Sequence, residues 1–479
     1  MTKNHCTNIL QDLITQGAIP PFVYCYPPRS TYRPLEREWS IEDIWKEDIR
    51  NSLNRDLNLY IHVPFCRYQC GFCNLYTIIS TDEDLYGKYV DAICRELLFY
   101  REIIQSRNLR TIYIGGGTPS LLATHHFETL FKTISDIYPN WRSVVEEVAI
   151  EASPDSIVSN PKVVSELMSL GLTRMNVGIQ SLMPGEIKEA GRAKAGVDVV
   201  REAIAIIKKA GLPNLSTDLI MGFSGQTDDT WKTSVTELVA LKPETISTYF
   251  LTVRPDAWFS TTGKYQYYRD STLYARYDMA REAFEEAGYV QESNVRYKKP
   301  GLGGYRQKVL QFRGTPYLGV GAGARTYTNT VDYIVGGSHK PNIEQVYEYI
   351  EMMMTGRPTI KAGFEYDDQE RIRKRIALDL FDLNLNELDR YNYQLHRPLF
   401  EPLFEAASSV GLLQTLGKDR LQLTREGFKY RDIISWAAFS DKVKELDETF
   451  YLKLHTLNDR AVNHLGSHRK ISGVQISNA

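Results

Sequence analysis

Six short segments between residues 57 and 253 have the apolar and polar pattern of strands, and they alternate with helical stretches. Most are separated by stretches with helical spacing of apolar residues, at 82–105, 127–137, 199–210 and 231–241. Successive strand–helix units predict an α/β fold with a parallel sheet and right-handed crossovers. Because six units are fewer than the eight of a closed barrel, we expect an open or partial barrel. The six segments are LNLYIHV, RTIYIG, EVAIEA, RMNVGI, STDLIMG and TISTYFLTV.

The first of these strands has two distinct faces. Its odd-numbered positions from 57 to 63 are all apolar, whereas Asn58, Tyr60 and His62 occupy the other face. If helices cover the apolar face, Tyr60 and His62 point into the barrel. Functional loops of such folds lie at the C-terminal ends of the strands, so we expect the loop after residue 63 to carry chemistry.

That loop, PFCRYQCGFC, contains three of the six cysteines of the chain, spaced C-x3-C-x2-C. Thiolates bind zinc or iron–sulfur clusters, and a structural zinc site needs four ligands. Three thiolates on a [4Fe–4S] cluster leave one iron open to an amine and a carboxylate. Cys66, Cys70 and Cys73 are therefore candidate cluster ligands, with free thiols or a degenerate zinc loop as the alternatives.

Polar residues also end the later strands. The segment IYIGGGTPS closes the second strand with three glycines, which let a backbone approach a ligand closely. Glu151, Gln180 and Asp218 lie at or near the ends of the third, fourth and fifth strands. Burying such groups without a partner is costly, so each is expected to bind a ligand or to satisfy loop backbone groups.

The composition favours a reduced intracellular setting. The formal net charge of the 479 residues is -2, which gives no general basic bias towards nucleic acid or an anionic membrane. No apolar run is long enough to span a bilayer, and the first residues, MTKNHCTNIL, lack the layout of a secretory signal. We expect a cytoplasmic protein with no nucleic-acid or membrane partner, in which cysteines stay reduced.

Four further regions flank or extend the barrel, which we assign to residues 56–290. Residues 1–55 form an arm whose prolines keep the stretch IPPFVYCYPPRSTYRP from being helical, and which either covers an opening or packs on the surface. Residues 291–360 extend the barrel, residues 361–440 form a C-terminal α+β domain, and residues 441–479 form a tail that ends in a mobile stretch.

The C-terminal domain has a winged-helix-like pattern. Residues 398–428 predict a helix, a hairpin and the start of another helix. Asp419 and Glu426 interrupt the basic residues of the hairpin, so a lid or packing module is favoured over a nucleic-acid-binding one.

Six motifs together resemble the HemN-like branch of the radical S-adenosylmethionine (SAM) superfamily. They are LYIHVPFCRYQCGFC, GGGTPSLL, IEASPDS, TRMNVGIQS, DLIMGFSGQT and LGVGAGA. This branch includes oxygen-independent coproporphyrinogen III oxidase, the heme chaperone HemW, an anaerobic heme-degrading methyltransferase, and class C methylases and cyclopropanases. The resemblance is strong over residues 55–330 and weaker to about 440. It implies a partial (βα)6 radical SAM barrel and a HemN-type C-terminal domain.

The resemblance implies a [4Fe–4S] cluster on the three cysteines and a first SAM in contact with Tyr60, Gly116 and Glu151. It also implies a second SAM, since coproporphyrinogen oxidase binds two. Thr252 and Arg325 match further SAM-contact positions. The positions that match the second SAM site are Phe72, Gly117, Thr118, Gln180, Arg192 and Asp218.

Arg192 and Arg325 have an alternative role in this sequence. A guanidinium pairs with a carboxylate through two parallel hydrogen bonds, so either arginine is equally suited to bind a substrate carboxylate.

The family chemistry is reductive cleavage of SAM to a 5′-deoxyadenosyl radical, with electrons from a donor such as flavodoxin or ferredoxin. Leu75 stands where coproporphyrinogen oxidase has a further cysteine, and HemW chaperones usually lack so long an arm. We therefore expect a class C-type two-SAM methylase or cyclopropanase that acts on an sp² carbon of a small molecule.

Two alternatives remain open. One is decarboxylation of coproporphyrinogen III or other tetrapyrrole chemistry, and the other is a HemW-like heme chaperone. The general base of a methylation cycle is unassigned. His62 is the nearest candidate, although a histidine that faces a barrel interior is more often structural.

Overall fold

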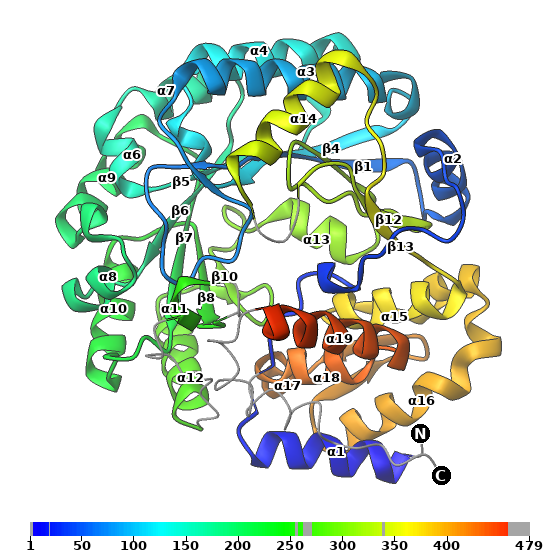
Figure 1. The fold of residues 1–479 in the computed structure, drawn as a ribbon. Helices are drawn as coiled ribbons and strands as arrows, with labels where there is room; N and C mark the ends of the chain where they lie inside the picture. Colours follow the sequence, from blue (N-terminus) through cyan, green and yellow to red (C-terminus); the bar gives the residue numbers. More distant parts are fainter. Residues whose placement is uncertain (1–2, 19, 254–256, 262–270, 338–340, 458–479) are drawn as a thin grey trace.

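A computed structural model of the protein describes residues 3–18, 20–253, 257–261, 271–337 and 341–457 (Figure 1). A sheet with the order β11-β1-β4-β5-β6-β7-β8-β10-β9 forms its centre. All six predicted strands are present in it, as β1 and β4 to β8. The strands are β1 (Asp56–Val63), β4 (Asn108–Gly116), β5 (Glu147–Ala152), β6 (Arg174–Gln180), β7 (Asn214–Met221), β8 (Thr245–Phe250), β9 (Val290–Gln291), β10 (Arg296–Lys298) and β11 (Tyr317–Val320).

The sheet is the open, partial barrel that the pattern predicts. Neighbouring strands are parallel from β11 through β8, whereas β10 runs antiparallel to β8 and to β9. Within the described ranges no ladder joins β11 to β9, so one side of the barrel is not closed by strand pairing.

Helices cover the outside of the curved sheet (Figure 1). The four predicted helices correspond to α3, α4, α9 and α10. At the start of α3 the Asp82 carboxylate accepts hydrogen bonds from the backbone N–H groups of Asp84 and Leu85, which fixes where that helix begins. The outer helices are α3 (Glu83–Ile104), α4 (Thr124–Ile137), α5 (Trp141–Val144), α6 (Pro154–Ser159), α7 (Val163–Ser169), α8 (Pro184–Glu189), α9 (Val197–Ala210), α10 (Asp228–Ala240), α12 (Ser271–Glu286) and α14 (Ile343–Thr355).

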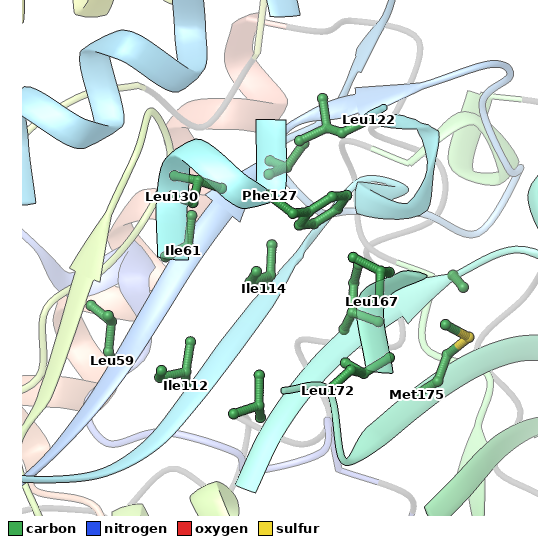
Figure 2. Close-up of a cluster of buried hydrophobic side chains, with 14 of the residues drawn as sticks. Leu59, Ile61, Ile112, Ile114, Leu122, Phe127, Leu130, Leu167, Leu172 and Met175 are labelled. Atoms are coloured by element: carbon green, nitrogen blue, oxygen red, sulfur yellow. The ribbon is translucent and has the colours of Figure 1, made fainter. Parts of the chain in front are cut away.

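The two faces predicted for β1 are confirmed. Figure 2 shows Leu59 and Ile61 of β1 beside Ile112 and Ile114 of β4, with Leu130 of α4 over them. Full burial of one such side chain stabilises the fold by about 1.5–3 kcal/mol. Since the apolar face takes the helices, the opposite face is left for the barrel interior.

Helix α13 (Arg306–Phe312) closes the barrel at the end where the strands begin. The Gln307 side-chain amide donates to the carbonyl of Leu59 (2.9 Å), and the backbone N–H of Arg306 donates to Glu147, the first residue of β5 (3.0 Å). The opposite end, where the strands finish, therefore remains for functional loops.

The N-terminal arm contains two helices that were not expected in it, α1 (Lys3–Thr15) and α2 (Ile41–Asn51). The intervening stretch, 20–40, is irregular apart from the short turn η1 (Arg29–Thr31), as its prolines predict. Helix α1 packs on the C-terminal domain, and α2 lies against the barrel (Figure 1).

The irregular stretch crosses the unpaired side of the barrel. The Phe22 ring meets the Tyr249 ring of β8 edge-on at 5.6 Å, and Cys25 packs with Tyr317 of β11. Residues 22–25 therefore bridge the two sides of the opening. Of the two placements considered for the arm, the structure has the one that covers an opening.

The C-terminal domain has the predicted helix, hairpin and helix. Its strands pair in the order β14-β16-β15. Its elements are α15 (Asp368–Asp379), β14 (Leu383–Asn384), α16 (Tyr393–Ser409), β15 (Leu413–Leu416), β16 (Arg420–Leu423), α17 (Arg425–Lys429), α18 (Arg431–Ala437) and α19 (Asp441–Leu457).

Two features lie at the predicted domain limits. Strand β12 (Val331–Ile334) pairs with β13 (Ala362–Glu365), so a two-stranded sheet crosses the boundary placed at residue 360. The first part of the expected tail is helix α19, which is tied to the arm where Ser30 donates a hydrogen bond to Asp447. Residues 458–479 lie outside the described part of the chain.

In the part of the chain described here, no helix combines the length and the apolar character needed to cross a bilayer.

A buried ion pair joins the arm to the barrel, and its removal is expected to be costly. Asp48 of α2 lies 2.7 Å from Arg107, and both side chains are 0% exposed. Asp48→Asn leaves the guanidinium without a counter-charge, so we expect the free energy of unfolding to fall by about 3–5 kcal/mol in urea denaturation. The matched control is Asp43→Asn on the same helix, whose carboxylate is 58% exposed and 3.6 Å from Lys46. A control variant as unstable as Asp48→Asn would contradict this account.

Stability is also expected to depend on Glu96, a buried residue of α3 that accepts hydrogen bonds from Gly321 N–H (2.9 Å) and the Tyr349 hydroxyl (2.6 Å). Burial raises the pKa of Glu96 from 4.5 to about 7. The folded protein thus holds this proton more tightly than the unfolded chain, so stability is lost as pH rises from about 4.5 to about 7.

Glu96→Gln removes this titration while keeping an acceptor oxygen. Relative to the natural protein, the variant should gain up to about 3 kcal/mol in free energy of unfolding between pH 5 and pH 8. Parallel pH–stability curves for the two proteins would show that Glu96 does not titrate as described.

Candidate functional site

A cavity of about 170 Å³ lies where β1 and β4 to β7 end. It brings together three cysteines from the loop after β1, the glycine run after β4, and polar residues from β5, β6 and β7. Besides Cys66, Cys70 and Cys73, its lining includes these residues singled out in the sequence: Phe72, Gly116, Gly117, Thr118, Glu151, Gln180, Arg192 and Asp218.

The cysteine loop is held in place from both ends and from its middle. At its base, the short strands β2 (Phe65–Cys66) and β3 (Ile78–Ile79) pair in parallel. In its middle, the N–H of Gly71 donates to the Ala190 carbonyl (3.0 Å), and the Gly71 carbonyl accepts from Phe259 (2.9 Å). A Cβ at position 71 would lie 2.0 Å from the Phe259 ring, so only glycine fits there.

The three cysteines all line the cavity, and none of them forms a disulfide. No group of three or more His, Cys, Asp or Glu side chains within the described ranges surrounds a single ion position. Three cysteines suit a cluster that is held at three of its irons better than a structural zinc ion, which needs four ligands. The donor set therefore fits an iron–sulfur cluster.

Burial of these thiols makes cluster binding depend on proton release. Burial raises the pKa of Cys66 to about 12 and that of Cys73 to about 11. Because iron binds the thiolate form, assembly of a cluster here must displace these protons.

The glycine run lets two loops run side by side. The N–H of Gly117 donates to the Val63 carbonyl (2.8 Å), and a Cβ at position 117 would lie 2.5 Å from the Phe65 carbonyl oxygen. Gly116 has φ of +120°, which a residue with a side chain rarely adopts. The glycines thus set the contact between the end of β4 and the cysteine loop.

Two carboxylates face the cavity from the neighbouring strands. Glu151 accepts hydrogen bonds from the Gly116 N–H and the Tyr113 hydroxyl, both at 2.8 Å, and Asp218 accepts from the Asn176 amide at 2.7 Å. Burial raises the pKa of both carboxyl groups. A cationic ligand in the cavity would oppose that effect and favour their ionised forms.

Gln180 owes its position to a local irregularity of β6. The register between β6 and β7 shifts between Gly178 and Gln180, and Gln180 has φ of +72°. Non-glycine residues with this backbone are uncommon and cost energy, and they gather at functional sites. The bulge places Gln180 in the cavity wall.

Arg192 joins the cysteine loop to β6. Its Nη1 donates to Cys70 Sγ (3.2 Å) and its Nη2 to the Gly178 carbonyl (2.8 Å), while its buried Nε has no hydrogen-bond partner. Arg192 thus ties the middle cysteine of the loop to the end of β6.

The remaining candidate residues lie outside the cavity lining. His62 is buried, with Nδ1 at 2.9 Å from the Tyr60 hydroxyl and Nε2 at 2.8 Å from the Tyr76 carbonyl. Both ring nitrogens are thus engaged, and burial lowers the pKa of His62 to about 4, which favours a structural role over that of a base. Thr252 bonds to the Phe250 carbonyl at 3.4 Å.

Tyr60 and Arg325 face the barrel interior away from the cavity. Tyr60 lies in a row of rings between Tyr113 and Tyr317. Arg325 donates to the Tyr24 hydroxyl of the arm at 2.8 Å. A direct contact of either residue with SAM remains a prediction.

Sequence reasoning missed several residues of the lining. Asn176 is a polar residue within an apolar strand, as Asp218 is, so it could have been predicted from the sequence in the same way. Tyr68 and Asp155, joined by a 2.9 Å hydrogen bond, come from two loops that only the fold brings together.

Known proteins with similar sequences belong to the radical SAM superfamily or are named heme chaperones. A family model described as the radical SAM superfamily matches residues 60–238. The heme chaperone HemW of Lactococcus lactis subsp. lactis (strain IL1403) is 27% identical over 308 residues, which cover 63% of this chain and 76% of that protein. The heme chaperone HemW of Mycobacterium tuberculosis (strain ATCC 25618 / H37Rv) is 28% identical over 396 residues, or 78% of this chain and 93% of that protein.

A solved structure supports the fold beyond the barrel. The coproporphyrinogen III oxidase HemN from Escherichia coli superposes with a TM-score of 0.70 at 19% identity. The match covers 89% of this chain and 98% of that chain, so it extends well outside residues 60–238.

Cys70→Ala is expected to lose the cluster without loss of the fold. Anaerobically reconstituted natural protein should hold about four irons per chain and absorb near 400 nm, whereas the variant should hold less than about one. The matched control is Cys94→Ala, because Cys94 is buried on α3 away from the cavity. Iron content unchanged in Cys70→Ala, or equally reduced in the control, would refute the three-cysteine site.

Proposed function

We propose a tetrapyrrole-binding function for this chain, which belongs to the HemN-like branch of the radical SAM superfamily. In this proposal the three-cysteine cavity holds a [4Fe–4S] cluster and SAM, and the barrel interior beside it holds heme or a related macrocycle. Relatives that align with most of the chain are named heme chaperones, which supports this choice over the methylase expected from the sequence.

The observation that carries the proposal is a row of tyrosine rings inside the barrel. The Tyr60 ring lies 6.0 Å from Tyr113 with an interplanar angle of 18°, and 5.4 Å from Tyr317 with an angle of 25°. At one end Tyr113 donates to Glu151 in the cavity wall, and at the other Tyr317 packs with Cys25 of the arm. The rings stack on one another, and Tyr113 also stacks on Tyr305 on its other side, so the row presents ring edges and hydroxyl groups to a ligand beside the cavity.

The residues of the cavity have separate tasks in this proposal. The cysteines hold the cluster, Arg192 holds Cys70 against the end of β6, and Glu151 with the backbone of Gly116 orients SAM. When bound, the cluster and SAM supply a 5′-deoxyadenosyl radical. The arm and α13 limit water access from the open side and from the opposite end, as a reactive intermediate requires.

A second candidate function is the two-SAM methylase. It is favoured by Phe72, Gln180 and Arg192, which lie in the same cavity as Gly116 and Glu151, two of the three residues assigned to the first SAM. Decarboxylation of coproporphyrinogen III is a third reading, and Leu75 stands against it at the position of that enzyme's further cysteine. The second SAM, an electron donor such as flavodoxin or ferredoxin, and a cytoplasmic location all remain predictions.

Hemin titration of the reconstituted protein is expected to show saturable, equimolar binding with a Kd of about 1 µM, followed by visible absorption. Tyr60→Leu removes one ring of the row and should weaken binding by roughly tenfold. Tyr347→Leu makes the same change at a side chain 49% exposed on α14, and should leave binding unaltered. Absence of saturable binding would overturn the tetrapyrrole proposal.

The same protein incubated with reductant and SAM carrying a deuterated methyl group separates the candidates. A heme-binding function predicts little turnover and unlabelled 5′-deoxyadenosine. Deuterium in 5′-deoxyadenosine, formed together with S-adenosylhomocysteine, would support the methylase instead.

A further inference from the structure

Three cationic side chains from separate parts of the chain gather on the open side of the barrel. Arg29 belongs to the arm, Lys308 to α13, and Arg325 to the loop after β11. The Tyr24 ring joins them, since its centre lies 5.6 Å from Lys308 Nζ and 5.1 Å from the Arg325 guanidinium carbon.

The three cations have only neutral partners among the described residues. Arg325 donates to the Tyr24 hydroxyl (2.8 Å) and lies 3.6 Å from Cys25 Sγ, and Lys308 donates to the Gln311 side chain (2.8 Å). None of the ion pairs found in the described part of the chain includes Arg29, Lys308 or Arg325, and Nε and Nη2 of Arg29 are buried without a hydrogen-bond partner.

Such an arrangement is costly in the absence of a ligand. Burial, with a further contribution from Arg325, lowers the pKa of Arg29 to about 10, and burial lowers the pKa of Lys308 to about 7. The nearest carboxylate that acts on Lys308 is Glu151, which is already bonded to Gly116 and Tyr113. Burial also acts to lower the pKa of Arg325, but the tyrosine hydroxyls around it raise that pKa overall. Since a buried cation without a counter-charge destabilises a fold, an anion at this place would remove an energetic cost at Arg29 and Lys308.

The position of the three cations suggests which anion they meet. The ring row of Tyr113, Tyr60 and Tyr317 begins at the cavity wall and ends beside Cys25 and Tyr327, where the cations lie. A planar ligand that lies along the row, in contact with the ring edges, would thus place its far edge at Arg29, Lys308 and Arg325. Guanidinium groups bind carboxylates through paired, charge-assisted hydrogen bonds.

We propose that Arg29, Lys308 and Arg325 form a binding site for carboxylate groups at the edge of the planar ligand, and that this site is complete only with the arm in place. The proposal rests on the proposed function for the planar ligand, and adds the chemical group that is recognised and the residues that recognise it. The sequence offered two roles for Arg325, a contact with SAM or a contact with a substrate carboxylate, and this proposal assigns it the second.

The test compares a tetracarboxylate, coproporphyrin III, with its uncharged tetramethyl ester, by fluorescence titration of the full reconstituted chain. The natural protein should bind the acid at least tenfold more tightly than the ester. Arg29→Gln and Arg325→Gln should each lower the affinity for the acid by about tenfold and change the affinity for the ester by no more than about twofold. The control is Arg37→Gln, which replaces an exposed arginine of the same arm. This variant should bind both the acid and the ester with the affinity of the natural protein. Equal affinity for acid and ester, or equal loss of both in the variants, would overturn the site.

A second measurement separates a structural role from a binding role. Because Arg29 has buried nitrogens without partners, Arg29→Gln should unfold at a temperature no lower than the natural protein when no ligand is present. An arginine that merely holds the arm in place would give a lower unfolding temperature when replaced.

The test also separates this site from the proposed function. If neither acid nor ester binds, the tetrapyrrole proposal fails, and benzene-1,3,5-tricarboxylate then serves as the probe in thermal unfolding. A rise in unfolding temperature for the natural protein but not for Arg29→Gln or Arg325→Gln supports the carboxylate site by itself. No rise in the natural protein overturns it.

Discussion

The close approach of two backbones at the ends of β1 and β4 is the constraint on which the site depends. Gly117 lies against the carbonyl of Phe65, at a distance that no side chain at position 117 would permit. This contact fixes the start of the cysteine loop over the strand ends that carry Glu151 and Asp218. The three thiols and the two carboxylates therefore share one cavity, although they come from segments up to about 150 residues apart in the chain.

Among the described residues, some charged side chains of the barrel interior have no ion-pair partner. The outer face of the sheet is covered by helices through ordinary apolar packing, whereas the inner face holds tyrosines, carboxylates and cations. The carboxyl groups lie at the cavity end and the unpaired cations at the arm end. This separation suits a cationic cofactor at one end and an anionic edge of a ligand at the other, with stacked rings between them.

The sequence predicts the local features well, because they depend on residues near one another in the chain. Strand alternation, helix spacing and the C-x3-C-x2-C loop were each readable from short segments, and Glu151, Gln180 and Asp218 follow from one rule about strand ends. Helix α2 has a readable pattern, with Ser40 capping its start and Ile41, Ile44 and Trp45 on one face, and it was missed because the arm was treated as one irregular, proline-rich segment. Helices α1 and α19 have weaker patterns and pack against distant elements. The cation cluster was beyond sequence reasoning, since Arg29, Lys308 and Arg325 meet only when the arm crosses the open barrel.

The most direct test of the central claim is electron paramagnetic resonance of the reduced, reconstituted protein with and without SAM. If three cysteines hold a [4Fe–4S] cluster with one iron open to SAM, the reduced protein should give a cluster signal that changes on addition of SAM. A protein that binds no cluster, or whose cluster signal is the same with and without SAM, would contradict the account.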